Sequence, residues 1–240
     1  MRLYAIGDIH GQLDLLKAAH GRIFRDGGRD ATIAHVGDLI DRGPDSAGVV
    51  DYLMKGRADG RPWIVTRGNH DRFLPKFIDD PDWIDPGLSS GAHWADHAGL
   101  GAAATLASYG VDPDRPRDAV LRDTRRAVPR AHARFLATLP LWYLHPRALV
   151  VHAGIRPGVD LQAQDEGDLV WIRKGFLDSD ADHGPLVVHG HTALDRPMLH
   201  RNRLNIDSGA AYGRELTAVV IDDDGVHVLT ETGRVPMMME

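Results

Sequence analysis

Short apolar runs alternate with amphipathic stretches over the first third of the chain. Residues 3–6, 32–36 and 63–65 are mainly apolar, as expected of parallel strands that are buried on both faces. Residues 12–24 repeat apolar side chains at the spacing of one helical face, and residues 45–53 read as a second helix after a Gly-Pro pair. This order predicts a parallel sheet with crossover helices.

The second half of the chain predicts another, mixed sheet. A hairpin is indicated by the turn sequence Asp223-Asp224-Gly225. Between the halves, an irregular segment over residues 75–129 predicts a mostly helical insertion that covers the active edge of the sheet. No repeat or linker divides the sequence, so we expect one domain over residues 1–240. The remaining expected strands are 148–151, 186–188, 204–206, 217–222 and 226–230, and the remaining expected helices are 129–138 and 168–177.

Composition narrows the chemistry. The chain has 43% hydrophobic and 26% charged residues, which is ordinary for a globular protein. Its net charge of −6 argues against a nucleic-acid partner. Cysteine is absent, which excludes disulfides and thiolate metal sites. No apolar stretch approaches the ~20 residues that span a bilayer, and no signal-peptide pattern opens the sequence. We therefore expect no membrane association and a cytoplasmic location; the oligomeric state stays open.

Polar, glycine-flanked clusters follow the predicted strands five times. One such cluster is ordinarily a turn, a helix cap or a structural histidine. Five at successive strand ends are not explained by turn chemistry, which has no use for histidine. Ligands bind just outside the carboxyl ends of strands in α/β sheets, and these residue types are metal ligands. The clusters are Asp8 with His10, Asp38 with Asp41 and Arg42, Asn69 with His70, His152, and His191.

The clusters lie in the motifs GDIHG, GDLIDRGP, GNHD, VHAG and HGHT. In this order they resemble the motif set of the calcineurin-like metallophosphoesterases. Within that group the chain is similar to the bacterial and phage serine/threonine protein phosphatases. The resemblance runs from Tyr4 to about Thr230 and is weakest over residues 75–129. It implies an α/β fold, a four-layer α-β-β-α sandwich with two mixed β-sheets.

The resemblance also implies a centre of two divalent metal ions. A carboxylate can give one oxygen to each of two cations ~3.5–4 Å apart, and such a pair activates water as a nucleophile. Ligands of oxygen and nitrogen without sulfur suit Mn²⁺, Fe or Zn²⁺, and the family favours Mn²⁺. Within HGHT, His191 is the expected ligand, and His189 is expected to pack beside the site. The implied ligands are Asp8, His10 and Asp38 for one ion, and Asp38, Asn69, His152 and His191 for the other.

The same resemblance makes His70 the general acid that protonates the leaving alkoxide, with Asp41 orienting its ring. The alternative for His70 is a purely structural role. Arg42 is implied as a phosphate clamp, because the guanidinium fork matches two phosphate oxygens.

Further substrate contacts are less well defined by the motifs. Arg173, in a stretch expected to be helical, is the second implied clamp, and Arg156 competes with it for this role. Tyr212 in DSGAAYG resembles a substrate-contacting tyrosine of the family, and a packing role is equally open.

Three function classes follow. The leading hypothesis is a metal-dependent phosphomonoesterase acting on phosphoserine or phosphothreonine in proteins, or on a small phosphoester. The alternative is a symmetrical diadenosine tetraphosphatase or another nucleotide phosphohydrolase. That group typically has Asn where this chain has Asp41, so the carboxylate favours a phosphatase. A non-catalytic binding module ranks lowest, because no implied ligand is missing.

The third motif, GNHD, differs at one position from the motif of the eukaryotic protein phosphatases. It ends in Asp71, where those proteins have Glu.

Overall fold

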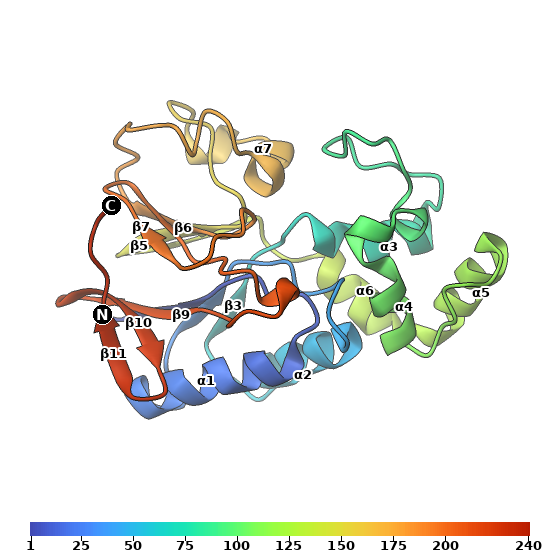
Figure 1. Ribbon diagram of the computed structural model, residues 1–240, viewed down its shortest axis with the longest axis horizontal. Helices are drawn as coiled ribbons and strands as arrows, with labels where there is room; N and C mark the ends of the chain where they lie inside the picture. Colours follow the sequence, from blue (N-terminus) through green and yellow to red (C-terminus); the bar gives the residue numbers. More distant parts are fainter.

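Two β-sheets form the centre of the computed structural model, which describes residues 1–240 (Figure 1). The first sheet has six strands in the order β11-β10-β9-β1-β2-β3. Its strands β1, β2 and β3 are parallel, and β9, β10 and β11 extend it in antiparallel fashion. The bounds are β1 (Leu3–Ile6), β2 (Ile33–His35), β3 (Trp63–Val65), β9 (Ala218–Asp222), β10 (Gly225–Thr230) and β11 (Gly233–Pro236).

The second sheet has five strands in the order β4-β5-β6-β8-β7. Its strands β5, β6 and β8 are parallel, with β4 and β7 antiparallel at the two edges. Both sheets are therefore mixed, as predicted. The bounds are β4 (Trp142–His145), β5 (Ala148–Val151), β6 (Leu186–His189), β7 (Met198–Leu199) and β8 (Arg203–Asn205).

Alternation along the strands builds the layers, because successive side chains point to opposite faces. Leu3 and Ala5 of β1 pack against the second sheet, together with Val150 and Val188. The intervening Tyr4 and Ile6 pack on the other face. Burial of a Leu or Ile side chain contributes about 1.5–3 kcal/mol, so burial on both faces holds β1 in place.

Helices cover the outer faces of the two sheets (Figure 1). The first sheet is covered by α1 (Leu13–Gly27) and α2 (Ser46–Ala58), whose buried residues share one core with the sheet. The second sheet is covered by α7 (Glu166–Trp171), through Leu169 packed among residues of β5 and β6. The predicted α-β-β-α order is confirmed. None of the helices is both long and apolar enough to cross a membrane.

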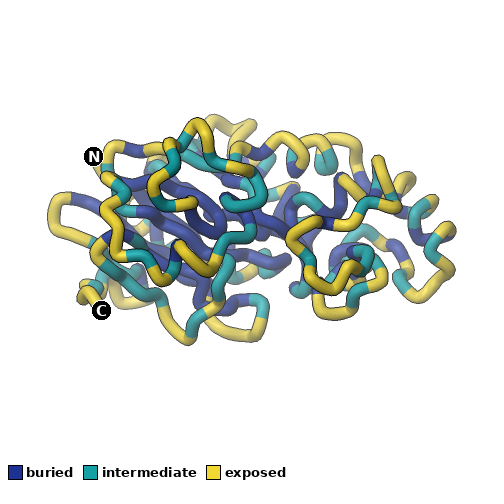
Figure 2. The backbone as a smooth tube through the Cα atoms, turned by 90° about the horizontal axis from the view of Figure 1, so that it is seen from above, coloured by how far each residue is buried: buried dark blue, intermediate teal, exposed yellow.

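The insertion over residues 75–129 alternates helices with irregular segments and lies in a lobe beside the sheets, at the right of Figure 1. Figure 2 shows that buried backbone concentrates in the sheets, whereas the lobe has more exposed segments. Trp94, Leu100 and Leu106 of the insertion nevertheless join the core under α1 and α2. The lobe contains α3 (Phe73–Asp79), α4 (Ala102–Ser108), α5 (Arg117–Ala127) and α6 (Arg130–Ala137). The short 3-10 turns of the chain are η1 (His70–Arg72), η2 (Trp94–Asp96), η3 (Ala98–Leu100), η4 (Leu161–Ala163) and η5 (Ala210–Tyr212).

Two local predictions were wrong. The helix expected over residues 168–177 ends at Trp171, because Ile172 adopts an extended conformation with ψ of 136°. Arg173 therefore lies in the following turn and not in a helix. The strands β4, β7 and β11 were missed, and all three lie at sheet edges. An edge strand pairs on one side only and is short or half exposed, so its apolar signal is weak.

Candidate metal centre and active site

Backbone strain is concentrated at the predicted site. Outside glycine, a positive φ costs about 1–3 kcal/mol and persists only where the surroundings impose it. The structure has five such residues, and every one of them belongs to the clusters singled out in the sequence. The strained turns follow β1, β2 and β6 and turn the side chains toward one place. The residues are His10, Asp38, Asp41, Arg42 and His191, with φ from 44° to 74°.

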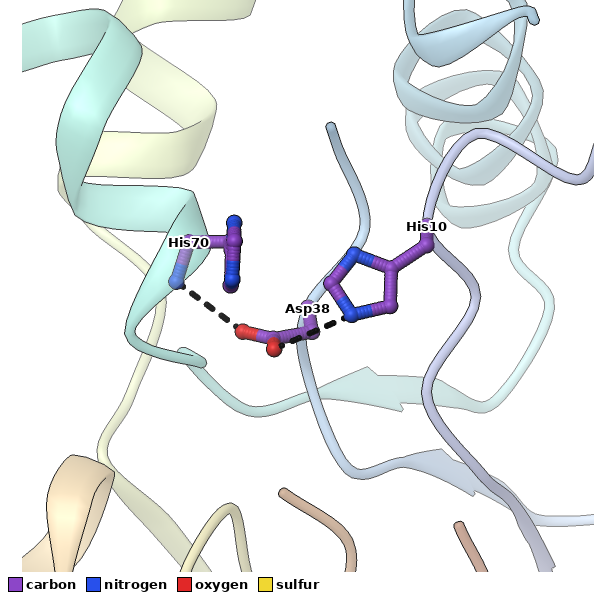
Figure 3. A group of neighbouring side chains, drawn as sticks. All are labelled: His10, Asp38 and His70. Carbon is purple, nitrogen blue, oxygen red and sulfur yellow. Dashed lines mark hydrogen bonds and ion pairs between the residues drawn. The ribbon is translucent and has the colours of Figure 1, made fainter. Parts of the chain in front are cut away.

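Asp38 lies at the centre of these turns. Figure 3 shows its carboxylate between His10 and His70. Asp38 Oδ2 lies 3.4 Å from His10 Nε2, and Asp38 Oδ1 lies 3.3 Å from His152 Nε2. The backbone N–H of His70 donates to Oδ1 over 3.0 Å. Gly68 leaves the necessary room, because a Cβ there would lie 2.1 Å from Asp38 Oδ1.

Two histidines present lone pairs to this carboxylate. His10 Nδ1 donates to the Ile40 carbonyl and His152 Nδ1 donates to the Val36 carbonyl, each over 2.9 Å. Neutral rings held in this way have an unprotonated Nε2. Burial lowers the pKa of both histidines, so the neutral form is favoured. At His152 an acceptor thus faces an acceptor, an arrangement that a bound cation resolves. The lone pair of His10 Nε2 faces Asp38 as well but accepts from Arg42 Nη1.

The second half of the cluster shows the same mismatch. Asn69 Oδ1 lies 2.9 Å from both His152 Nε2 and His191 Nδ1. His191 Nε2 and Asp8 Oδ1 are buried and have no hydrogen-bond partner. Buried polar atoms are seldom left unpaired. The side chains that converge here are carboxylate, amide and imidazole, which suit divalent cations such as Mn²⁺ or Zn²⁺. The residues present therefore fit the implied metals.

The charges agree with such a centre. Burial raises the pKa of Asp8 well above its usual range, and the charges of Asp207 and Asp38 raise it further. Burial acts to raise the pKa of Asp38 as well, whereas positive charge at the places of the surrounding histidines, His152 foremost, lowers it below its usual range. Two buried carboxylates together need positive charge nearby.

Seen from the ligand atoms, the cluster divides into two overlapping sets within 4.8 Å, His10 with Asp38 and His70, and Asp38 with His152 and His191. Asp38 belongs to both sets, as expected of a bridging ligand. Asp8 lies outside them but joins the cluster through Oδ2, which accepts from the His191 backbone N–H over 3.0 Å. A Cβ on Gly190 would lie 1.8 Å from Asp8 Oδ1, so glycine is required there.

His70 and Asp41 form a pair at the edge of the cluster. His70 Nδ1 lies 2.7 Å from Asp41 Oδ2, and both side chains are buried. Arg42 Nη2 donates to His70 Nε2 over 3.1 Å, so Nδ1 carries the ring proton and donates it to Asp41. The structure thus brings together the residues expected to act as acid and orienting group.

A cavity of about 300 Å³ opens over the cluster and is lined by polar and apolar side chains. Arg173 lines it and donates to the His191 carbonyl over 3.3 Å. Tyr212 lines it as well, with its ring 5.5 Å from the Arg42 guanidinium. The competitor Arg156 is not in the lining, because its guanidinium pairs with Asp168 over 2.6 and 2.8 Å. The residues that line the cavity are Asp38, Arg42, Asn69, His70, Leu88, Leu100, Trp171, Arg173, His191, Thr192, Ala193, Asp207 and Tyr212.

Two further motif residues have structural positions. His189 is buried against Phe176, with ring centroids 5.1 Å apart, and so packs beside the site as expected. Asp71 accepts from the backbone N–H groups of Leu39 and Gly68, each over 2.8 Å. Burial, reinforced by Asp38, raises the pKa of Asp71 to about 7. Asp71 therefore ties together the two loops that follow β2 and β3.

Sequence reasoning missed several residues at the site. Trp94 and Thr105 contact Asp41 from the insertion. Trp171 and Asp207 line the cavity. Only Asp207 had a local signal, since it opens the DSGAAYG stretch that contains Tyr212. The others reach the site through long-range packing that no local pattern indicates.

A two-sheet sandwich with Asp, His and Asn gathered at its strand ends defines a class of metal-dependent phosphoesterases. The family model described as calcineurin-like phosphoesterase matches residues 1–229, and the chain belongs to this family. It is therefore a metallophosphoesterase, a hydrolase of phosphoesters that uses divalent metal ions.

Two relatives of this chain are named for different activities. The chain is 29% identical over 242 residues to an asymmetrical bis(5'-nucleosyl)-tetraphosphatase, PrpE, of Bacillus velezensis, covering 88% of this chain and 86% of the relative. It is 29% identical over 231 residues to serine/threonine-protein phosphatase 1 of Salmonella typhimurium, and the match covers 90% of this chain and 89% of the relative. Its fold is similar to that of a metallophosphoesterase from Sphaerobacter thermophilus, with a TM-score of 0.56 and 20% identity. The match covers 99% of this chain and 90% of that structure.

Proposed function

We propose that this chain is a serine/threonine protein phosphatase, with phosphorylated proteins as its partners. The ligands would be Asp8, His10 and Asp38 for one divalent ion, and Asp38, Asn69, His152 and His191 for the other. Mn²⁺ is the ion we favour. When bound, such ions supply Lewis-acid stabilisation of the phosphoryl oxygens and activate water.

The observation that carries the substrate class is the His70–Asp41 pair, with its 2.7 Å contact at the cavity wall. Release of a serine or threonine side chain leaves an alkoxide, which is a poor leaving group and needs a proton. A general acid accelerates such a step by typically 10²–10⁴-fold. Cleavage of a phosphoanhydride releases a phosphate, which needs the proton less. A buried, oriented acid therefore favours a phosphate ester of an alcohol.

The chain's own residues then divide the work. Arg42 and Arg173 bind the phosphate oxygens with two guanidinium forks. As the doubly protonated imidazolium, His70 gives its Nε2 proton to the leaving oxygen and becomes the neutral ring with its proton on Nδ1. Asp41 holds the ring orientation through Nδ1 and stabilises the charged form before the transfer. Tyr212, which is 61% exposed at the cavity mouth, contacts the part of the substrate beyond the phosphate.

Hydrolysis of a dinucleoside tetraphosphate is the second candidate. It is favoured by the relative named PrpE and by the aromatic wall of the cavity, where Trp171 lies edge-on to His191 at 5.5 Å. Such a ring can stack on a base. The relative is named as the asymmetrical type, whereas the sequence hypothesis was the symmetrical type.

The test gives Mn²⁺-loaded enzyme a phosphoserine peptide and diadenosine tetraphosphate side by side. We expect the larger kcat/KM for the peptide, and a loss of that activity in His70→Asn. A much larger kcat/KM for the dinucleotide would transfer the assignment to the second candidate, and its products, two ADP or ATP with AMP, would then separate the symmetrical from the asymmetrical type.

A further inference from the structure

We propose that Trp94 and Thr105 of the insertion are positioning residues for the reaction, acting on His70 through the carboxylate of Asp41. This inference rests on the proposed function of His70 as general acid. It assigns a role to a tryptophan that the sequence left without one, and it makes the insertion part of the proton-transfer apparatus.

Trp94 shares an acceptor atom with the acid. Its indole Nε1–H donates to Asp41 Oδ2 over 2.9 Å, and the same oxygen lies 2.7 Å from His70 Nδ1. The indole is 5% exposed. It lies parallel to Phe73, at 9° with centroids 6.4 Å apart, and meets Phe77 edge-on at 5.6 Å. The donor therefore sits on a ring whose orientation is fixed by packing.

Thr105 holds the other carboxylate oxygen. Its hydroxyl donates to Asp41 Oδ1 over 2.7 Å and accepts from the Asp41 backbone N–H over 2.9 Å. The Thr105 hydroxyl is also 3.0 Å from the Ser46 hydroxyl at the start of α2. Both Asp41 oxygens are thus occupied, one by Thr105 and the other by His70 and Trp94.

This arrangement leaves the carboxylate one orientation. Asp41 has a φ of 74°, a strained conformation that its surroundings must impose. Without the two donors from the insertion, the carboxylate could turn about its own axis and the His70 ring would lose its orientation. The insertion also accepts from the Arg42 backbone N–H through the Gly101 carbonyl at 3.2 Å. Three of its residues therefore fix the strained turn that presents Asp41 and Arg42.

The experiment compares two aryl phosphates on the Mn²⁺-loaded full-length enzyme. Phenyl phosphate has the poorer leaving group and depends on the general acid, whereas 4-nitrophenyl phosphate depends on it much less. For His70→Asn we expect a loss of kcat of on the order of 100-fold or more with phenyl phosphate and a much smaller loss with 4-nitrophenyl phosphate. For Trp94→Phe we expect the same selectivity, with about a tenfold loss on phenyl phosphate.

The matched control is Trp83→Phe. Trp83 lies in the same insertion, but its ring packs on Arg72, Lys76 and Phe73 and, unlike Trp94, it has no hydrogen bond to Asp41. We expect kcat within about twofold of wild type on both substrates, as for substitutions away from special features. A second pair keeps the inference testable if Trp94→Phe folds poorly. Thr105→Val, which removes the hydroxyl, should lower kcat for phenyl phosphate more than kcat for 4-nitrophenyl phosphate. Thr105→Ser, which keeps the hydroxyl, should restore kcat for phenyl phosphate.

A double-mutant cycle tests the route through Asp41. If Trp94 acts on His70 through this carboxylate, Trp94→Phe should have no further effect in an Asp41→Asn background. An equal loss on both substrates, or an undiminished effect in that background, would overturn the inference. Failure of the proposed function shows separately, as a loss in His70→Asn that does not depend on the leaving group.

Discussion

Arg42 Nη1 donates to His10 Nε2 over 2.7 Å. The same guanidinium donates through Nη2 to His70. A permanent cation thus lies against the lone pair that a metal ion would take from His10. Binding of a metal ion by His10 requires Arg42 to leave this atom, and a displaced guanidinium at the cavity wall is available to a phosphate group.

Replacement of Arg42 by Gln should therefore separate metal binding from substrate binding. We expect kcat/KM for 4-nitrophenyl phosphate to fall about 10- to 100-fold, because a hydrogen bond to a charged group contributes about 1.5–3 kcal/mol. Mn²⁺ should bind at least as tightly as in wild type, since a competing cation is gone. Steady-state kinetics and calorimetric Mn²⁺ titration measure the two effects. Weaker Mn²⁺ binding in the variant would contradict the competition.

Arg173 and Arg156 give a matched comparison on one side of the cavity. Arg173 lines the cavity, whereas Arg156 is exposed and paired with Asp168. We expect Arg173→Gln to raise KM about tenfold through the lost phosphate contact. Arg156→Gln should leave kcat and KM near wild type, because an exposed ion pair contributes about 0–1 kcal/mol to stability and nothing to the site. A larger effect from Arg156 would reverse the assignment.

Strand-end residues were predictable because each motif is local. Asp8 and His10 follow one apolar run by a few residues, and parallel strands deliver their carboxyl ends to one edge. The contact between Trp94 and Asp41 spans 53 residues of chain. It depends on how the insertion packs, and sequence spacing carries no information about it. The turn containing Arg173 was mistaken for a helix because the apolar spacing continues past Ile172 while the backbone does not.

Asp38→Asn should remove the metal centre. The carboxylate of Asp38 lies within reach of both histidine sets, and an amide cannot supply the same charge to two cations. We expect a loss of kcat of on the order of 10³-fold, in keeping with the several kcal/mol that metal ions contribute. Metal analysis of the purified variant should show a reduced Mn²⁺ content.

Thermal unfolding gives an independent measure of the same centre. A ligand present at 100 times its dissociation constant stabilises the native state by about 2.7 kcal/mol. Mn²⁺ should therefore raise the Tm of the wild type and not that of Asp38→Asn, and EDTA should reverse the rise. An equal rise in both proteins would place the bound ion elsewhere.

A buried histidine pair that does not line the cavity should make the fold sensitive to acid. His35 Nδ1 donates to the Ile64 carbonyl over 2.8 Å, so its Nε2 accepts from His20 Nε2–H over 2.9 Å. His20 Nδ1 in turn accepts from the Tyr52 hydroxyl over 2.9 Å. Every ring nitrogen has its partner while both rings are neutral. A further proton on His35 Nε2 would face the His20 Nε2–H, so it would have no acceptor in this arrangement.

The sign of the effect follows from the pKa values. Burial lowers the pKa of His35 to about 4, and burial together with His35 lowers the pKa of His20 to about 2. In the unfolded chain both are near 6.5. Below pH ~6.5 the unfolded state therefore binds more protons than the native state, and stability falls as the pH falls toward 4, by at most about 2.7 kcal/mol per pH unit for the pair. Urea unfolding of metal-free protein from pH 7.5 to 4 measures this slope.

The metal-ligand histidines add to the slope in every variant, so the informative quantity is the difference in slope between wild type and variant. His35→Asn should reduce the slope by about one proton's share, about 1.4 kcal/mol per pH unit, and an unchanged slope would show that the pair is not the acid-sensitive element.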